Sequence, residues 1–157
     1  LNEELTCKIP AAQKKKIYIS ALSQLRLDEY NPLASSDNRL LRRMVRDMQF
    51  RGTSPAETLL RWRSVRRGEN KNIFPYQENA DFYFNSALVY ELPAIRPLIE
   101  PALQEIAMSS PAWLEAKRLL RLIQYFLPTK PDNIPLNSIA QEFIGKSLYH
   151  ALPGEKD

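Results

Sequence analysis

Four arginines between residues 39 and 46 form the chain's most specific chemical pattern. Arg39, Arg42, Arg43 and Arg46 recur at intervals of three and four residues, which places them within an arc of roughly 100° on an α-helix. The opposite side of that helix is apolar and consists of Leu40, Leu41, Met44, Val45 and Met48. A guanidinium group stays charged, and its donors match two phosphate oxygens at once. We therefore predict a helix that packs one face on the protein and presents four cations to an anionic ligand.

Positive charge is concentrated around this array. Residues 39–71 hold nine arginines and one lysine against three acidic residues, a net charge of +7 in a chain whose total is +4, so the remainder carries −3. Such asymmetry indicates an anionic partner for one region. Three interpretations stay open from the residues alone: ion pairs with acids on neighbouring elements, binding to an RNA or DNA backbone, and binding of a small phosphate compound.

A second cluster mixes cations with aromatic residues. Arg66, Arg67 and Lys71 precede Phe74 and Tyr76. In proteins that bind single-stranded nucleic acids, aromatic rings stack on bases while cations hold phosphates. The same composition also suits a structured loop anchored by its two aromatic side chains, so both interpretations stay open.

Several classes of chemistry are disfavoured by composition. Cys7 and His150 are the only cysteine and histidine, too few for a zinc site of the Cys/His type. A single cysteine excludes an intrachain disulfide and favours a reducing compartment. No apolar run approaches the roughly 18 residues that span a bilayer. The chain starts at Leu1 without an initiator Met or a secretory signal pattern. We expect a cytoplasmic protein that is a piece of a longer one.

Helices make up most of the elements that must position these residues. We predict the arginine helix over 36–51, closed by Gly52. Ser54-Pro55 suits the start of a second helix over 56–65, which Gly68 is expected to break.

The second half of the chain also reads as helical. Prolines at 93, 97 and 101 predict a kinked or segmented helix, because an interior proline costs a helix ~3 kcal/mol. The clearest helix starts at Ser110-Pro111 and extends to Leu127. A short last helix is predicted over 137–144, closed by Gly145.

Two segments read as strands. Residues 17–22 are β-branched and aromatic, and residues 80–88 contain three consecutive aromatic side chains. Two strands alone make a poor sheet, so we expect them to belong to a larger parallel sheet whose other strands precede Leu1. The predicted fold class is therefore α/β, present as a mostly α-helical fragment with about two strands.

The stretch Asp37–Gly52, with Arg51 as its last cation, resembles the lid segment of the uridine kinase and phosphoribulokinase family. Lys16–Ser20 resembles the strand that leads into that lid, and Leu1–Leu5 the segment after the family's acidic strand. Three further stretches resemble the branch in which the kinase is fused to domains similar to the N-terminal part of threonyl-tRNA synthetase. They are Ser64–Asp81, Asn85–Leu92 and Asn137–Gly145.

This resemblance implies the C-terminal part of a P-loop-type nucleoside kinase over residues 1–157. In it, 1–35 is a strand and loop into the lid, 36–79 is the lid with its basic loop, and 80–157 is a strand with C-terminal helices. ATP with Mg2+ would donate its γ-phosphate to the 5'-hydroxyl of a uridine- or cytidine-like nucleoside. The implied phosphate contacts are Arg43, Arg46 and Arg51, joined by Arg39 and Arg42. Possible contacts to nucleotide or substrate are Arg61, Arg66, Arg67, Lys71 and Tyr76.

Departures from the family pattern limit this expectation. Thr53 replaces a family arginine and Arg61 aligns with a nucleoside-binding glutamine, so the nucleoside stays open. The chain has four glycines, too far apart to form a phosphate-binding Gly-x-x-x-x-Gly-Lys-Ser/Thr loop, and the family's catalytic acid should precede Leu1. We expect the chain alone to be inactive. The alternatives are a basic RNA-binding module and a partner-docking domain, and exposed apolar surface makes self-association an expectation as well.

Overall fold

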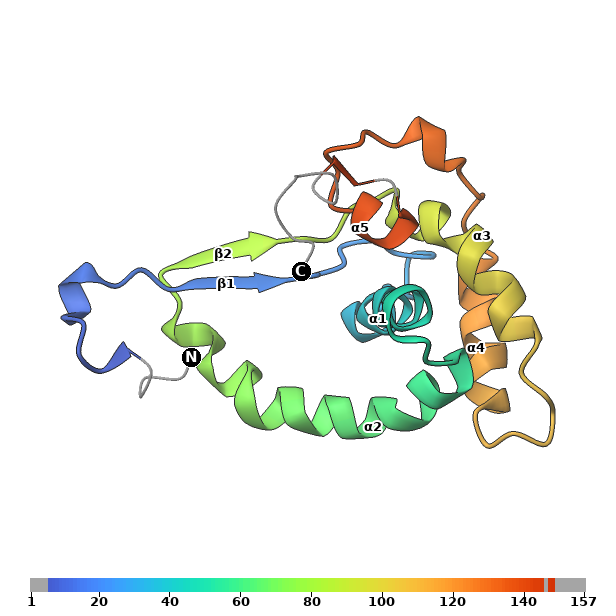
Figure 1. The fold of residues 1–157 in the computed structure, drawn as a ribbon, viewed down its shortest axis with the longest axis horizontal. Helices are drawn as coiled ribbons and strands as arrows, with labels where there is room; N and C mark the ends of the chain where they lie inside the picture. The colour runs from blue at the N-terminus through green and yellow to red at the C-terminus, as the bar shows by residue number, and fades with distance from the viewer. Residues whose placement is uncertain (1–5, 146, 149–157) are drawn as a thin grey trace, which may run out of the picture.

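The computed structural model describes residues 6–145, 147 and 148, and helices dominate them (Figure 1). The α-helices are α1 (Ser35–Arg51), α2 (Pro55–Asn72), α3 (Glu91–Gln104), α4 (Trp113–Ile123) and α5 (Gln141–Ile144). The strands are β1 (Ile17–Ser20) and β2 (Phe82–Asn85), and the 3-10 turns are η2 (Ala11–Gln13), η3 (Phe74–Asn79) and η4 (Pro131–Asn133). The predicted mostly helical fragment with two strands is therefore confirmed at this level.

The two strands pair with each other in parallel, in a register that runs from Ile17 opposite Phe82 to Ser20 opposite Asn85. Both are shorter than predicted, because the Asn85 side chain takes over the pairing where they end. Its amide donates to the Leu22 carbonyl at 2.9 Å and accepts from the Leu22 N–H at 2.9 Å. Apolar side chains on the sheet stay exposed, and self-association through them remains a prediction.

Local signals at the first two helices work as expected, with one exception. Gly52 closes α1 in the left-handed conformation with φ +59°, and Ser54 forms a capping box with Glu57 at the start of α2. The predicted break at Gly68 is wrong, because α2 continues to Asn72. Glu69, the next residue, is buried and paired with arginines, and this anchoring outweighs the ~1 kcal/mol helix cost of a glycine.

The later helices differ from prediction mainly at their ends. Pro97 and Pro101 lie inside one continuous α3, because burial of its apolar face compensates for the lost hydrogen bonds. α4 starts at Trp113, since Ser110 first forms a turn with it. It ends at Ile123 because the following N–H groups turn to closer carbonyls, and Tyr125 donates to Leu122. α5 covers only the second half of the predicted segment and is closed by a glycine with φ +90°.

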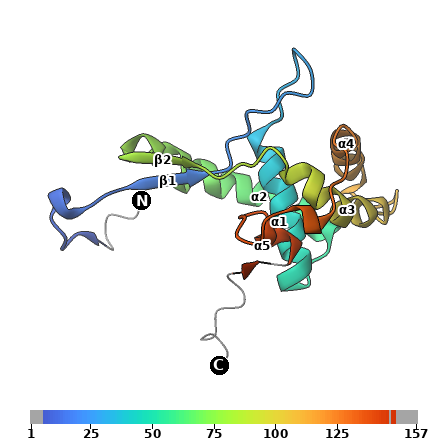
Figure 2. The same ribbon diagram turned by 90° about the horizontal axis from the view of Figure 1, so that it is seen from above.

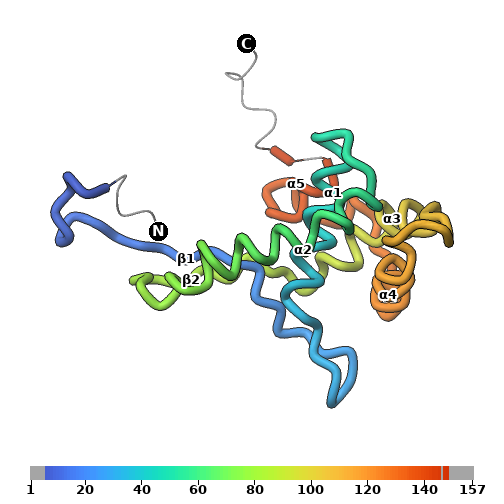
Figure 3. The backbone as a smooth tube through the Cα atoms, turned by 90° about the horizontal axis from the view of Figure 1, so that it is seen from below, coloured from blue at the N-terminus to red at the C-terminus, as the bar shows by residue number. Residues whose placement is uncertain are grey.

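The core is formed mainly by the buried faces of α1, α3 and α4, with α3 packed against both of the others. Figure 1 shows α1 almost end-on between α2, α3, α4 and α5. Figure 2 shows the sheet lying to one side of α1, α3, α4 and α5, while α2 extends from these helices toward the sheet. The predicted apolar face of α1 is confirmed, and Leu40, Leu41 and Met44 are fully buried. Figure 3 shows that the N-terminal segment extends beyond the sheet, away from this core. None of the helices in the described part of the chain is both long and apolar enough to cross a membrane.

Candidate functional site

Four of the five arginines of α1, namely Arg39, Arg42, Arg43 and Arg46, line one pocket of about 510 Å³. The pocket lies between α1, α2, the ends of the two strands and the α5 region. Its remaining walls are partly apolar and come from Ile19, Ser20, Ala21, Trp62, Val65, Glu69, Phe84, Ser86, Ile139, Glu142 and Phe143. We call it the arginine pocket. The predicted grouping of the four cations on one side of the helix is thus confirmed.

Arg39 is held by α2 rather than left free. Its guanidinium donates to the buried carboxylate of Glu69 and lies 5.6 Å from the centre of the Phe74 ring. Arg66 reaches the same carboxylate at 3.2 Å and the same ring at 5.5 Å. Glu69 and Phe74 therefore bind two arginines together, and Arg39 connects α1 to the end of α2.

Arg42 is tied still more firmly, to the start of α3. Its guanidinium donates to both carboxylate oxygens of Glu91, one of them at 2.7 Å, and Glu91 is 0% exposed. It also donates to the Ser86 hydroxyl at 3.1 Å. The guanidinium carbon, Cζ, lies 5.3 Å from the centre of the Phe143 ring. With this many partners Arg42 joins α1 to the residue that follows β2 and to the start of α3. The interpretation of ion pairs with neighbouring acids is confirmed for Arg39 and Arg42.

Asp47 shares its carboxylate between two further arginines of α1. Arg43 Nε lies 3.2 Å from one oxygen, but without the alignment of a hydrogen bond. Arg51 Nη1 donates to the other oxygen at 2.8 Å. Arg51 is half exposed and does not line the arginine pocket. Of these two residues, only Arg43 therefore faces the space where a ligand would bind.

Arg46 differs from the other arginines of the array. Its side chain lines the arginine pocket and is half-buried. Its Nε, like that of Arg43, is fully buried without a hydrogen-bond partner among the described residues. Unlike Arg43, it forms no ion pair with a carboxylate of the described chain. A buried donor that makes no hydrogen bond is destabilising and rare. Arg46 is therefore the residue at which an anionic acceptor would gain most.

The remaining predicted contacts lie on α2 and η3, away from this pocket. Arg61, Arg67 and Lys71 are exposed and none of them lines it. Tyr76 lies at a small separate pocket of about 100 Å³ beside β1. Arg66 and Phe74 are engaged with Glu69 and Arg39, as described above. The segment is thus held as an anchored structure, and the geometry brings none of its cations to the arginine pocket.

The sequence interpretation missed the acids that organise the site. Two of these acids could have been predicted from helical spacing within the basic segment. Asp47 lies four residues from both Arg43 and Arg51, and Glu69 lies three residues from Arg66. Glu91 lies 49 residues from Arg42, and no local pattern links them. Trp62 packs against the core and also lines the pocket.

The described residues contain no group of three or more His, Cys, Asp or Glu side chains placed to hold a metal ion. Cys7 is exposed, while His150 and Gly154 lie outside the described residues. Comparison of the chain with protein-family models, with curated proteins and with solved structures finds no match.

Proposed function

We propose that the arginine pocket binds the phosphate groups of a nucleotide, as the phosphate lid of an ATP-dependent nucleoside kinase of the uridine kinase type. The observation that carries the proposal is Arg46, a cation on the pocket wall whose buried Nε has no partner in the described structure. Arg43 stands beside it with only a poorly aligned acid contact. A phosphate oxygen accepts hydrogen bonds from guanidinium groups, so a phosphate bound in the pocket can pair with both cations.

The other walls suit the remainder of a nucleotide. The pocket volume of about 510 Å³ falls within the ~300–1,000 Å³ of small-molecule sites. Trp62 and Phe84 add accessible aromatic surface, on which a base or sugar can pack. Phosphoryl transfer depends mainly on positioning and charge neutralisation, which arginines of a lid supply.

Two parts of a kinase active site, the phosphate-binding loop and the carboxylates that hold Mg2+, are not found among these residues. The chain has no glycine-rich phosphate loop, and its described residues offer no carboxylate cluster for Mg2+. We therefore derive no step through Mg2+. We expect the 157-residue chain to bind nucleotide phosphate without transferring it, so a nucleoside panel with ATP should yield no phosphorylated product.

ATP binding can be followed by the fluorescence of Trp62, because this residue lines the same pocket. In a Trp113→Phe background Trp62 is the sole reporter, since the chain has two tryptophans. ATP should bind, and Arg46→Gln should weaken binding roughly tenfold or more, because a charge-assisted hydrogen bond contributes about 1.5–3 kcal/mol.

The matched control is Arg63→Gln, since Arg63 is an exposed cation of α2 outside the pocket. It removes the same charge and should leave ATP affinity nearly unchanged. Equal losses in the two variants, or no ATP binding at all, would contradict the proposal. The salt dependence of binding distinguishes this proposal from the alternative of RNA binding. Affinity for a long polyanion falls steeply as the salt concentration rises, whereas affinity for one ATP falls gently.

A further inference from the structure

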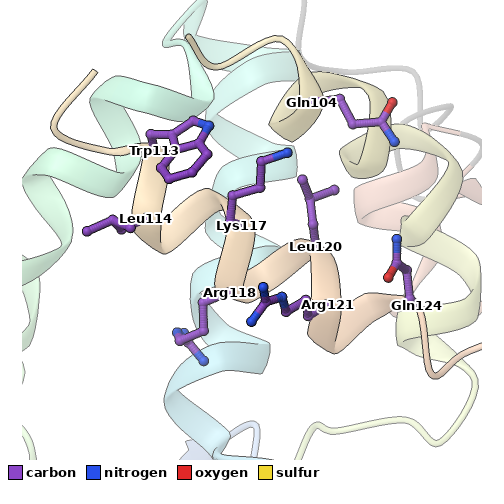
Figure 4. Close-up of a pocket in the computed structure, with 8 residues that line it drawn as sticks. All are labelled: Gln104, Trp113, Leu114, Lys117, Arg118, Leu120, Arg121 and Gln124. Atoms are coloured by element: carbon purple, nitrogen blue, oxygen red, sulfur yellow. The ribbon is translucent and has the colours of Figure 1, made fainter. Parts of the chain in front are cut away.

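A second basic hollow lies on the opposite side of the core from the sheet, along the exposed side of α4. It has a volume of about 750 Å³. Figure 4 shows Trp113, Lys117 and Arg121 in succession along α4, with Gln104 of α3 at the rim and Leu120 between them. We call it the α4 hollow. It shares no lining residue with the arginine pocket.

The α4 hollow is positively charged without compensation. Among the residues that the structure describes, none that lines it is acidic. Arg118 is satisfied elsewhere, because it donates to Asp37 at 2.8 Å and to Glu115 at 2.7 Å. Arg121 is exposed and has no ion pair within the described part of the chain. Lys117 forms no ion pair within the described residues, and its ammonium group lies 5.7 Å from the centre of the Trp113 ring. Two cations are thus available to an anion at this surface.

The remaining wall is suited to a flat ring. Trp113 is half-buried, so its indole is held in place while part of it stays accessible. The contact with Lys117 is an exposed cation–π interaction, which is weaker than the stacking of a base on an aromatic ring. A base can therefore displace the ammonium group, which then turns to a phosphate. Gln104 and Gln124 border the hollow, and their amides donate to and accept from base edges.

We infer that the α4 hollow is a second nucleotide site, in which the base stacks on Trp113 and the phosphate binds Arg121 and Lys117. This inference is independent of the proposed function, because the two sites have separate residues and separate tryptophans. The ligand chemistry, a base with a phosphate, comes from two sources: a free mononucleotide, or one unit of single-stranded RNA.

The test uses Trp113 as the reporter, in the full chain with Trp62→Phe. Uridine 5'-monophosphate and an oligouridylate of about eight nucleotides are titrated in turn, with uridine alone and inorganic phosphate as partial ligands. Both nucleotide probes should quench Trp113 saturably, and each partial ligand should bind more weakly. If Trp62→Phe impairs folding, the wild-type chain labelled with 5-fluorotryptophan gives one resonance for each site.

Arg121→Gln should raise the dissociation constant roughly tenfold, whereas Arg63→Gln should leave it unchanged. Both side chains are exposed, so neither change threatens folding. A much tighter oligouridylate with a steep loss of affinity in salt identifies RNA as the source, and similar affinities identify a free mononucleotide; either result supports the site. Absence of saturable quenching, or equal effects of the two variants, overturns it.

Discussion

The two basic regions of the molecule differ in what holds their cations. In the arginine pocket, Arg39 and Arg42 are bound by the buried carboxylates of Glu69 and Glu91. In the α4 hollow, Lys117 and Arg121 form no ion pair within the described residues. Each region also contains one of the chain's two tryptophans. The difference shows that a dense row of arginines overstates the number available to a ligand.

Burial explains why Arg39 and Arg42 need buried carboxylates as partners, whereas Lys117 and Arg121 do not. Guanidinium groups at intervals of three and four residues repel one another, and this repulsion grows where water is removed. The fold places the α1 row against three other elements, so counter-charges come from α2 and α3. The exposed side of α4 remains in water, which solvates Lys117 and Arg121 without a carboxylate.

The largest expected effect tests whether Arg42 is a structural connection. Glu91→Ala leaves Arg42 nearly buried without its partner, so the free energy of unfolding should fall by about 3 kcal/mol. Urea denaturation measures it. The control is Glu100→Ala, which removes a carboxylate paired with Arg96 on the surface of the same helix and should have a much smaller effect. If the two variants lose the same free energy of unfolding, Arg42 is not a structural connection, and the contrast between bound and available cations is wrong for this residue.

A smaller loss of stability should follow when the ion pair between α4 and the start of α1 is removed. Arg118 of α4 donates to both oxygens of Asp37 at the start of α1, at 2.8 Å each. Hydrogen bonds from Arg118 to Glu115 and to Asp37 raise the pKa of this guanidinium, so it stays charged at all working pH values. Because Arg118 is 45% exposed, Asp37→Ala should cost only about 1 kcal/mol in urea denaturation. Glu115→Ala, which leaves the contact to Asp37 in place, should cost less.

The ion pairs Arg42–Glu91 and Arg118–Asp37 could not be predicted from the sequence, whereas features that depend on neighbouring residues could. The ends of α1 and the start of α2 follow from Gly52 and the Ser54 cap, which act within a few residues. The apolar face of α1 follows from helical spacing. Glu91 and Asp37, by contrast, meet arginines 49 and 81 residues away, and only the packing of the helices brings them together.

The same limit explains the error at Gly68 and the uneven result for the candidate site. Intrinsic propensity favours a helix break there, but Glu69 is fixed by two arginines from different helices. The four arginines between residues 39 and 46 lie on one face of α1, as helical spacing predicts. The sequence interpretation did not separate Arg46 from Arg39 and Arg42, because availability depends on acids that helical spacing does not reveal.

The N-terminal cap of α2 should have an effect of similar size that depends on pH. α2 carries Glu69, so its start helps to position the acid of the arginine pocket. The Ser54 N–H donates to the Glu57 carboxylate at 2.9 Å, and the Glu57 N–H donates to Ser54 Oγ at 3.3 Å. Ser54→Ala removes the hydroxyl group and should lower the free energy of unfolding by about 1 kcal/mol at neutral pH.

The sign of the pH dependence follows from Glu57. The hydrogen bonds from the backbone and side chain of Ser54 lower its pKa from the ordinary 4.5. Its contribution is therefore complete above pH 4.5 and disappears as the pH falls through the lower folded-state value. The difference between wild type and Ser54→Ala should shrink in that acidic range, as urea titrations at several pH values will show. A constant difference would contradict this account of the cap.

The smallest expected effect on stability separates the ligand-binding cation from the structural ones. Arg46→Gln removes a like charge between neighbours and a buried donor that lacks a partner, so stability should be unchanged or rise by a few tenths of a kcal/mol. Arg42→Gln, on the same helix face, should instead lower it substantially, because Glu91 loses its partner. Urea denaturation measures the stability of the two variants, and the fluorescence titration measures their ATP affinity. If Arg46 binds the ligand, Arg42→Gln shows the larger loss of stability and Arg46→Gln shows a loss of ATP affinity without a loss of stability. A loss of stability in Arg46→Gln comparable to that in Arg42→Gln would make the whole row structural and leave the pocket without its phosphate contact.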